Sequence, residues 1–457
     1  MTLAPDQVTV PSRDDPVVRS SSAVIGGPLG RYAVPLARGW KYYAALYAAL
    51  TAVPMALGAL ERGHCVEAGW STPDQFWHMC FSDVSATFQS QNLGAGVGAL
   101  LTGASDAPTP AQPPLTAMAM SLLGGLVPGG DADSRTRFYF GLWAVLATAL
   151  LALVAWWTAA STRRFPIRAA QVALSPVVAL TALVGPDALG VALASAALYA
   201  WTRSRLVWSG ILFGLAISAR SYPLLIVLAV LFVALRAGRV RAWAVVAAGA
   251  GAAFAGVFLV LVVGNPGGAM RAYAEWWQGG AGFGSPWVVG QITGHPLPTW
   301  LLTGIAATGW VIAVLLGAFL ALACDRRPGV AEVALVMVTV VLVTGKSMPV
   351  QASLWLVPLV ALCGMWWRDY LVWAGAEALH FAAVWLYLAG VSVPDRALPA
   401  GWYTLFLLLR IAAVAWLAVQ VWRTAQARAP RAAEPEETDE LAGPVRDAPD
   451  ALVVRVV

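Results

Sequence analysis

The chain is poor in charge and almost without lysine. Only 12% of its 457 residues are charged, whereas 59% are hydrophobic, and a soluble domain carries about twice that share of charge. An ordinary soluble domain is therefore excluded. No Walker motif, Rossmann fingerprint or zinc-ligand spacing occurs, so we expect no cofactor and no metal. The net charge of +5 reflects arginines at helix ends, and we expect no nucleic-acid partner.

What is present instead is a series of apolar runs near the ~20 residues that span a bilayer. We expect an all-α, polytopic membrane protein with about 12 transmembrane helices over residues 39–425. Residues 1–38, which lack a signal-peptide core, and residues 426–457 are expected to be disordered cytoplasmic segments. The runs are 42–60, 138–160, 169–184, 188–202, 206–219, 222–235, 242–263, 300–323, 329–344, 350–365, 370–390 and 402–422.

Arginine placement predicts the topology. Basic clusters fall at every second connection between the runs, which the positive-inside rule assigns to the cytoplasm, together with both termini. Residues 61–137 then form a long first extracytoplasmic loop. Its apolar stretch 113–129 would reverse every later loop if it crossed, so we expect an in-plane or re-entrant helix there.

Two cations lie on the predicted outer side, where cations are rare. Lys346 follows the run that ends at Thr344, and Arg220 lies between two runs. The alternative for Arg220 is snorkelling to lipid headgroups. Two cations on one face are what a lipid-linked phosphate needs, because arginine offers a planar fork and lysine a point charge.

Two acids also lie at outer junctions. Asp83 follows Cys80-Phe81-Ser82, and an acid among aromatic residues is a candidate general base. Taken alone, however, the sequence favours a helix cap formed by Ser82 or Asp83. Asp187 follows Gly-Pro and fits a helix cap and a functional acid about equally.

The remaining polar residues have simpler expected roles. Cys65 and Cys80 share the oxidising outer side, so we expect a disulfide rather than two free thiols. We expect loop hydrogen bonding more than catalysis from His295. Inside the spans, Glu377 and His380 share a helix face, and Arg410 lies in the last run. For these three residues we expect a structural Glu–His or Glu–Arg contact between the last two helices.

In their order along the chain, four stretches resemble the GT-C glycosyltransferases, and most closely glycosyltransferase family 87 with its actinobacterial mannosyltransferase-like membrane proteins. Glu377 and His380 also fit a later helix of these relatives. The stretches are Cys80-Phe81-Ser82-Asp83, similar to Cys-Tyr-Ser-Asp; Pro186-Asp187-Ala188-Leu189, similar to Trp-Asp-Leu-Leu; residues 219–225, similar to Ala-Lys-Leu-Tyr-Pro-Leu-Leu; and residues 346–355, similar to Lys-Val-Tyr-Ser-Pro-Gln-Tyr-x-Leu-Trp.

The resemblance implies a GT-C-like fold with in-plane helices in the first outer loop. It implies transfer of a sugar, mannose or another hexose, from polyprenyl phosphate to a glycolipid or polysaccharide at a bacterial plasma membrane, with membrane lipids as further partners. Asp83 is then the catalytic base. Arg220 and Lys346 bind the donor phosphate, which makes a metal unnecessary. Asp187, Gln351, His295 and His78 position substrates. A transporter or flippase of lipid-linked sugar, or an inactive scaffold, remains the alternative.

Overall fold

The computed structural model describes residues 15–30, 38–91, 93–104, 109–427 and 440–454, which contain helices and no strand. In this described part, six helical segments are long and apolar enough to cross a membrane, by length and composition. The expected all-helical, membrane-embedded chain is confirmed at this level. The six are α2–α3 (Trp40–Leu50 and Ala52–Glu61), α9 (Ala132–Ser161), α15 (Val240–Gly264), α18 (Thr299–Ala323), α21 (Trp367–Ser392) and α22 (Ala400–Ala427).

The other predicted spans are shorter helices, several of which begin at a proline, because proline is well accommodated in a first helical turn. A 15-residue helix rises only about 22 Å, less than the ~30 Å of a bilayer core. The full set of 12 spans therefore stays a prediction. These helices are η2 (Pro166–Ala169), α10 (Ala170–Ala173), α11 (Pro176–Thr181), α12 (Asp187–Thr202), α13 (Leu206–Ala219), α14 (Pro223–Arg236), α19 (Val330–Thr344), η3 (Val350–Trp355) and α20 (Leu356–Cys363).

The core lies around α19, where nearly every residue is buried. A helix that is apolar on all sides is expected at such a position. The apolar helix α15, by contrast, has only 17% of its most hydrophobic window buried, and Leu259, Val260 and Val263 are exposed. That surface suits contact with lipid.

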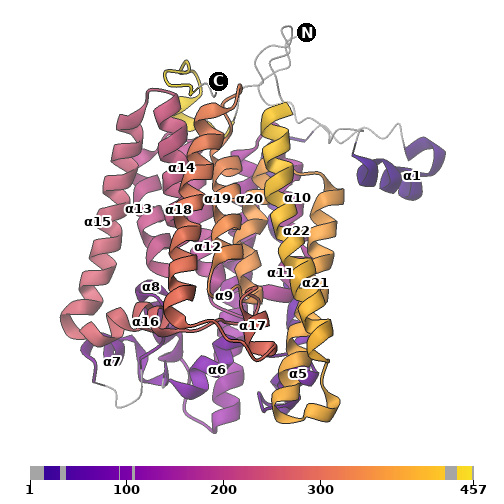
Figure 1. Cartoon of the computed structure of the whole chain (residues 1–457), viewed down its shortest axis with the longest axis vertical. Helices are drawn as coiled ribbons and strands as arrows, with labels where there is room; N and C mark the ends of the chain where they lie inside the picture. Colours follow the sequence, from indigo (N-terminus) through magenta and orange to yellow (C-terminus); the bar gives the residue numbers. More distant parts are fainter. Residues whose placement is uncertain (1–14, 31–37, 92, 105–108, 428–439, 455–457) are drawn as a thin grey trace.

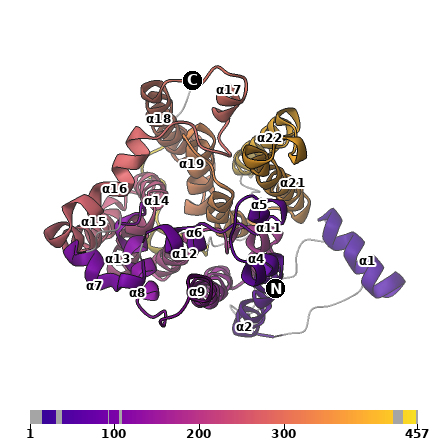
Figure 2. The same cartoon turned by 90° about the horizontal axis from the view of Figure 1, so that it is seen from below.

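The connecting helices gather at one end of the bundle (Figure 1). Seen from that end, the helices of the first loop spread across the bundle (Figure 2). With 11 residues, α8 is too short to cross a bilayer, as expected for the stretch 113–129. The helices at this end are α4 (Gly63–Ala68), α5 (Asp74–Trp77), α6 (Asp83–Ser90), α7 (Gly96–Thr102), α8 (Pro114–Gly124), α16 (Pro266–Gln278) and α17 (Val288–Ile292).

The expectation of disordered termini is wrong for the parts that are described. Residues Pro16–Gly30 form helix α1. Residues 440–454 pack against the bundle at the end opposite the first loop (Figure 1), and Val445 is fully buried. The rest of both segments lies outside the described residues.

Candidate functional site

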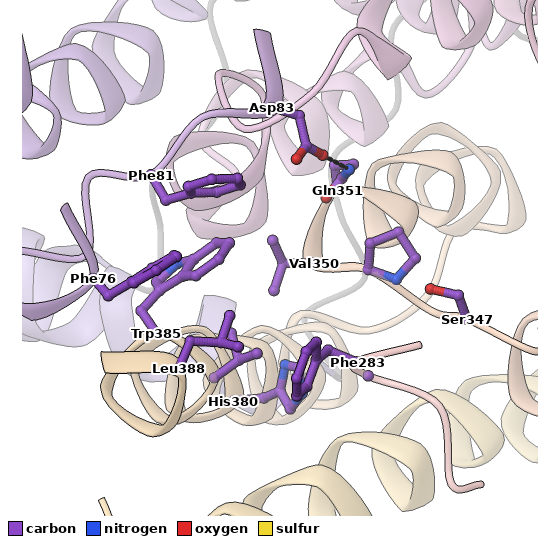
Figure 3. A pocket seen from close by; sticks show the side chains of 13 residues that line it. Phe76, Phe81, Asp83, Phe283, Ser347, Val350, Gln351, His380, Trp385 and Leu388 are labelled. Carbon is purple, nitrogen blue, oxygen red and sulfur yellow. Dashed lines mark hydrogen bonds between the residues drawn. The ribbon is translucent and has the colours of Figure 1, made fainter. Parts of the chain in front are cut away.

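A pocket of about 270 Å³ lies among four segments that are far apart in the sequence. Its walls are mainly aromatic and aliphatic, with a few polar groups between them, which is the usual character of a ligand site. Figure 3 shows Asp83 and Gln351 on one side and His380 on the other. The lining residues are Phe76, Phe81, Asp83, Phe283, Gly284, Ser347, Pro349, Val350, Gln351, His380, Val384, Trp385 and Leu388.

Asp83 is held at the pocket wall by one backbone and one side-chain hydrogen bond, both to residues that are distant in the sequence. Its N–H donates to the carbonyl of Val184 at 2.7 Å. Its Oδ2 accepts a hydrogen bond from Gln351 Nε2 at 2.7 Å (Figure 3). Ser82 occupies the N-cap position of α6, but its hydroxyl donates to the Leu183 carbonyl at 2.8 Å and makes no capping hydrogen bond. The interpretation of these two side chains as a helix cap is therefore wrong.

The surroundings make Asp83 a stronger base than a free carboxylate. Burial raises the pKa of Asp83 to about 6, although the Gln351 hydrogen bond and the charge of Arg220 act in the opposite direction. The negative charge of Asp187 adds to the increase. Such a group is mostly ionised at neutral pH and is well matched to proton transfer.

Arg220 and Asp187 form a two-point ion pair beside Asp83. Arg220 Nε donates to Asp187 Oδ1 at 3.0 Å, and Nη2 donates to Oδ2 at 3.3 Å. Trp355 Nε1 also donates to Asp187 Oδ1, at 2.8 Å. Asp187 is buried, whereas the Arg220 side chain is 27% exposed. Its third nitrogen, Nη1, makes no hydrogen bond within the described part of the chain, so one edge of the guanidinium remains open.

Lys346 does not present a free ammonium group. It is 3% exposed, and its Nζ donates to the carbonyls of Trp276, Trp277 and Gly279 at 3.0, 3.0 and 3.1 Å. An ammonium has three hydrogens, and these three acceptors use all of them. The carbonyls belong to the last turn of α16 and to Gly279, which follows it, and a cation is also favoured there by the helix dipole. The geometry thus supports a role for Lys346 in closing α16, not the expected role in holding a phosphate.

The expected structural contact inside the spans is confirmed as a Glu–Arg pair. Arg410 Nε donates to Glu377 Oε2 at 2.8 Å, and both side chains are buried. Arg410 also donates to the Met348 carbonyl at 2.6 Å and to Ser353 Oγ at 2.9 Å. The pair therefore ties α21 to α22 and holds the segment that carries Gln351.

His380 takes no part in that pair. Its ring lies on the pocket wall, and neither ring nitrogen has a hydrogen-bond partner among the described residues. Buried polar groups are almost always hydrogen-bonded, so an unpartnered imidazole beside a pocket suggests a ligand. The sequence marks Glu377 and His380 together, but only the structure separates the structural residue from the pocket residue.

The aromatic wall was not predicted as part of the site. Phe81 lies 5.4 Å from Phe76 and 5.1 Å from Trp385, measured between ring centroids. The aromatic richness of the first loop was the available signal. The wall depends on the contact of α5 with α21, which joins segments about 300 residues apart and could not be found locally.

Three further expectations have clear outcomes. Cys65 and Cys80 form the predicted disulfide, with Cα atoms 5.8 Å apart. His295 Nδ1 forms a loop hydrogen bond with the Thr293 carbonyl at 2.9 Å. His78 contacts Asp74 on the surface of the first loop. Neither His78 nor His295 lines the pocket, so the structure gives no support to their predicted part in positioning substrates.

No family model, curated protein or solved structure matches this chain. The resemblance to GT-C glycosyltransferases therefore stays a prediction, and function has to be inferred from the site.

Proposed function

We propose that this protein transfers a sugar, mannose or another hexose, from a polyprenyl-phosphate donor to a hydroxyl group of a cell-envelope glycolipid or polysaccharide. One observation carries the proposal. A half-buried carboxylate with a raised pKa, Asp83, lines an aromatic pocket and lies within the electrostatic influence of Arg220, whose guanidinium keeps one edge open. Asp83 provides the base, and Arg220 provides the cation.

In the proposed reaction, Asp83 takes the proton of the acceptor hydroxyl. The hydroxyl oxygen forms a bond to the anomeric carbon of the donor sugar at the same time. The bond between that carbon and the phosphate oxygen breaks, and its electron pair leaves with the polyprenyl phosphate. Arg220, already oriented by Asp187, stabilises the charge that develops on the phosphate through its open edge. Attack opposite the leaving group inverts the anomeric centre. Asp83 then releases its proton to water.

The pocket suits the acceptor. Flat aromatic side chains such as Phe81 and Trp385 match the apolar face of a sugar ring, and Ser347 and His380 offer hydrogen bonds to hydroxyl groups. Gln351 holds the carboxylate of Asp83 in position. Lys346 contributes indirectly, because it fixes the loop that carries Phe283.

We place the reaction on the outer face of a bacterial plasma membrane, with both termini in the cytoplasm. Support comes from the pocket, which shares one end of the bundle with the first loop, while Arg236 and Arg327 lie at the other end with residues 440–454. In a Cys324→Ala/Cys363→Ala background, Gln278→Cys should react with an impermeant maleimide in whole cells, and Arg203→Cys should not. The reverse pattern would overturn the orientation.

The decisive experiment is sugar transfer by purified protein from radiolabelled polyprenyl-phosphate sugar to envelope glycolipid. Asp83→Asn should reduce transfer by at least about a hundredfold while leaving donor binding nearly unchanged. Glu67→Gln is the matched control, because Glu67 is an exposed acid of the same loop, and it should retain activity. Movement of donor across vesicles without product would instead support a transporter, and binding without either would support a scaffold.

A further inference from the structure

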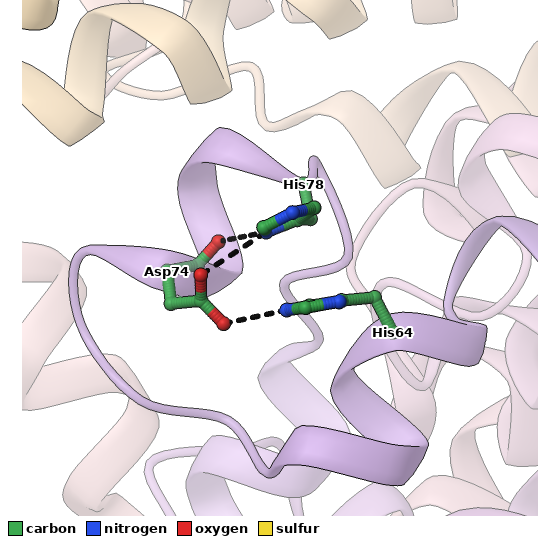
Figure 4. A group of neighbouring side chains, drawn as sticks. All are labelled: His64, Asp74 and His78. Carbon is green, nitrogen blue, oxygen red and sulfur yellow. Dashed lines mark hydrogen bonds and ion pairs between the residues drawn. The ribbon is translucent and has the colours of Figure 1, made fainter.

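Two histidines and one aspartate converge on the surface of the first loop (Figure 4). His64 Nε2 lies 2.6 Å from Asp74 Oδ2, and His78 Nδ1 lies 3.2 Å from Asp74 Oδ1. The two imidazole rings are stacked, with centroids 3.5 Å apart and planes inclined by 17°. One potential ligand atom from each of the three residues lies within 4.8 Å of the others.

The cluster is built by the fold and is held by a covalent link. His64 comes from α4, whereas Asp74 lies in α5 and His78 follows it. The Cys65–Cys80 disulfide joins the two segments immediately beside the histidines. Each carboxylate oxygen of Asp74 faces a different imidazole, so the three groups point toward one another (Figure 4).

We infer that His64, Asp74 and His78 bind one divalent transition-metal ion, for which Zn²⁺ is the best chemical match. Imidazole nitrogens with a carboxylate oxygen are typical zinc ligands, whereas Ca²⁺ and Mg²⁺ prefer oxygen ligands alone. Tetrahedral bonds of about 2.0–2.2 Å place ligand atoms about 3.3–3.6 Å apart. The candidate ligand atoms already lie within 4.8 Å of one another, and binding requires the two stacked imidazole rings to rotate until both nitrogen lone pairs point at the ion.

The site has room for entry and for a fourth ligand. The side chains of His64, Asp74 and His78 are 38%, 35% and 45% exposed, so an ion reaches them from solvent and water completes the coordination. The ligands are also connected to the pocket. Phe76, which lies in the helix turn between Asp74 and His78, stacks on Phe81 at the pocket wall. A bound ion would rigidify this wall, whether or not the pocket transfers sugar.

Sequence spacing alone did not predict this site, because residues 64, 74 and 78 match no standard zinc motif. The ligands meet in the folded loop, beside the disulfide between Cys65 and Cys80. The expectation of no metal rested on the missing motif and on the two cations predicted to bind the donor phosphate.

The test is titration of EDTA-treated, non-reduced, full-length protein with ZnCl₂ by calorimetry. We expect one ion per chain. His64→Asn, Asp74→Asn and His78→Asn should each weaken binding by at least about tenfold. His295→Asn is the matched control, because His295 is an exposed histidine outside the cluster, and it should bind like wild type. Co²⁺ should give the visible absorption of a four-coordinate site in wild type and not in Asp74→Asn.

A second measurement separates lost ligands from lost folding. Zinc should raise the melting temperature of wild type and His295→Asn, and it should leave that of Asp74→Asn unchanged. The variants should melt like wild type when zinc is removed. Absence of saturable zinc binding in wild type, or equal binding by wild type and all three cluster variants, would overturn the site.

Discussion

The role of Asp83 is decided by neighbours that are distant in the sequence. Local sequence favours a helix cap at this position, because an acid or serine before an amphipathic segment usually caps it. In the fold, the hydroxyl of Ser82 is used by Leu183, and the carboxylate of Asp83 meets Gln351, which lies 268 residues away. Burial by segments from three parts of the chain then makes the residue a candidate base.

The raised pKa of Asp83, about 6, predicts the pH dependence of the proposed transfer. A general base must be ionised, so kcat/KM should be constant above this value and fall tenfold per pH unit well below it. This fall should be measured in kcat/KM, because the pH dependence of kcat/KM reports the pKa values of the free enzyme. A profile that stays flat down to pH 5 would show that Asp83 does not act as the base.

Variants of the Arg220–Asp187 pair should have separable effects on stability and on the binding of polyprenyl phosphate. Arg220→Gln leaves the buried carboxylate of Asp187 without its cation, a loss of up to about 3–5 kcal/mol for a buried pair. The double variant Arg220→Gln/Asp187→Asn removes both charges and should recover most of the melting temperature. It should still bind polyprenyl phosphate at least about tenfold more weakly than wild type. Wild-type affinity in the double variant would limit Arg220 to a structural role.

At the scale of helices, the hydrophobic runs predicted where the helices lie in the sequence better than they predicted how long the helices are. Each of the 12 runs overlaps a described helix, because apolar segments must be buried in protein or lipid. Prolines then shorten several of them. For example, the run 169–184 is divided by Pro176, and α11 starts there with Ser175 as its cap. Hydropathy averages do not show such breaks.

The environment of Lys346 was beyond prediction for a related reason. Its position at a helix end is visible in the sequence, but its acceptors belong to α16, about 70 residues earlier in the chain. In the sequence, an exposed lysine cannot be distinguished from a buried lysine that caps a distant helix. Only the fold, which brings α16 next to Lys346, distinguishes them. Burial also lowers the pKa of the Lys346 ammonium, which weakens the case for an exposed phosphate ligand further.

We therefore predict that Lys346→Met loosens the end of α16. Without the ammonium, three carbonyls of that turn lose their donor, and residues 276–285 should exchange backbone hydrogen faster by mass spectrometry. Transfer should fall because the loop that carries Phe283 moves. Arg271→Met is the control, because Arg271 lies in the same helix and pairs with Glu275 on the surface. Unchanged exchange with weaker polyprenyl phosphate binding would restore the phosphate-binding role.

On the scale of the whole molecule, residues 440–454 contact two arginines from distant segments, Arg236 and Arg327. Arg236 is fully buried and donates to the carbonyls of Ala321 and Cys324 as well as to Asp450. Arg327 also pairs with Asp450. The acidic composition of the tail suggested disorder, because composition describes a segment without its partners. The run of acids at residues 434–437 lies outside the described residues, and within residues 440–454 ion pairs with arginines of distant segments hold Asp450.

This contact predicts how stability depends on pH. Burial alone would raise the pKa of Asp450, but the hydrogen bonds from Arg236 and Arg327 outweigh it and lower the pKa overall. A carboxyl with a lowered pKa stabilises the fold above its unfolded value of about 3.9, and that contribution is lost as the pH falls through the folded value. Asp450→Asn should thus lower the melting temperature at pH 7, and the difference from wild type should shrink below about pH 4. The exposed Asp447 of the same segment provides the matched control, and Asp447→Asn should melt like wild type. Equal melting of the Asp450 and Asp447 variants at pH 7 would show that the Asp450 ion pairs contribute nothing to the stability of the bundle.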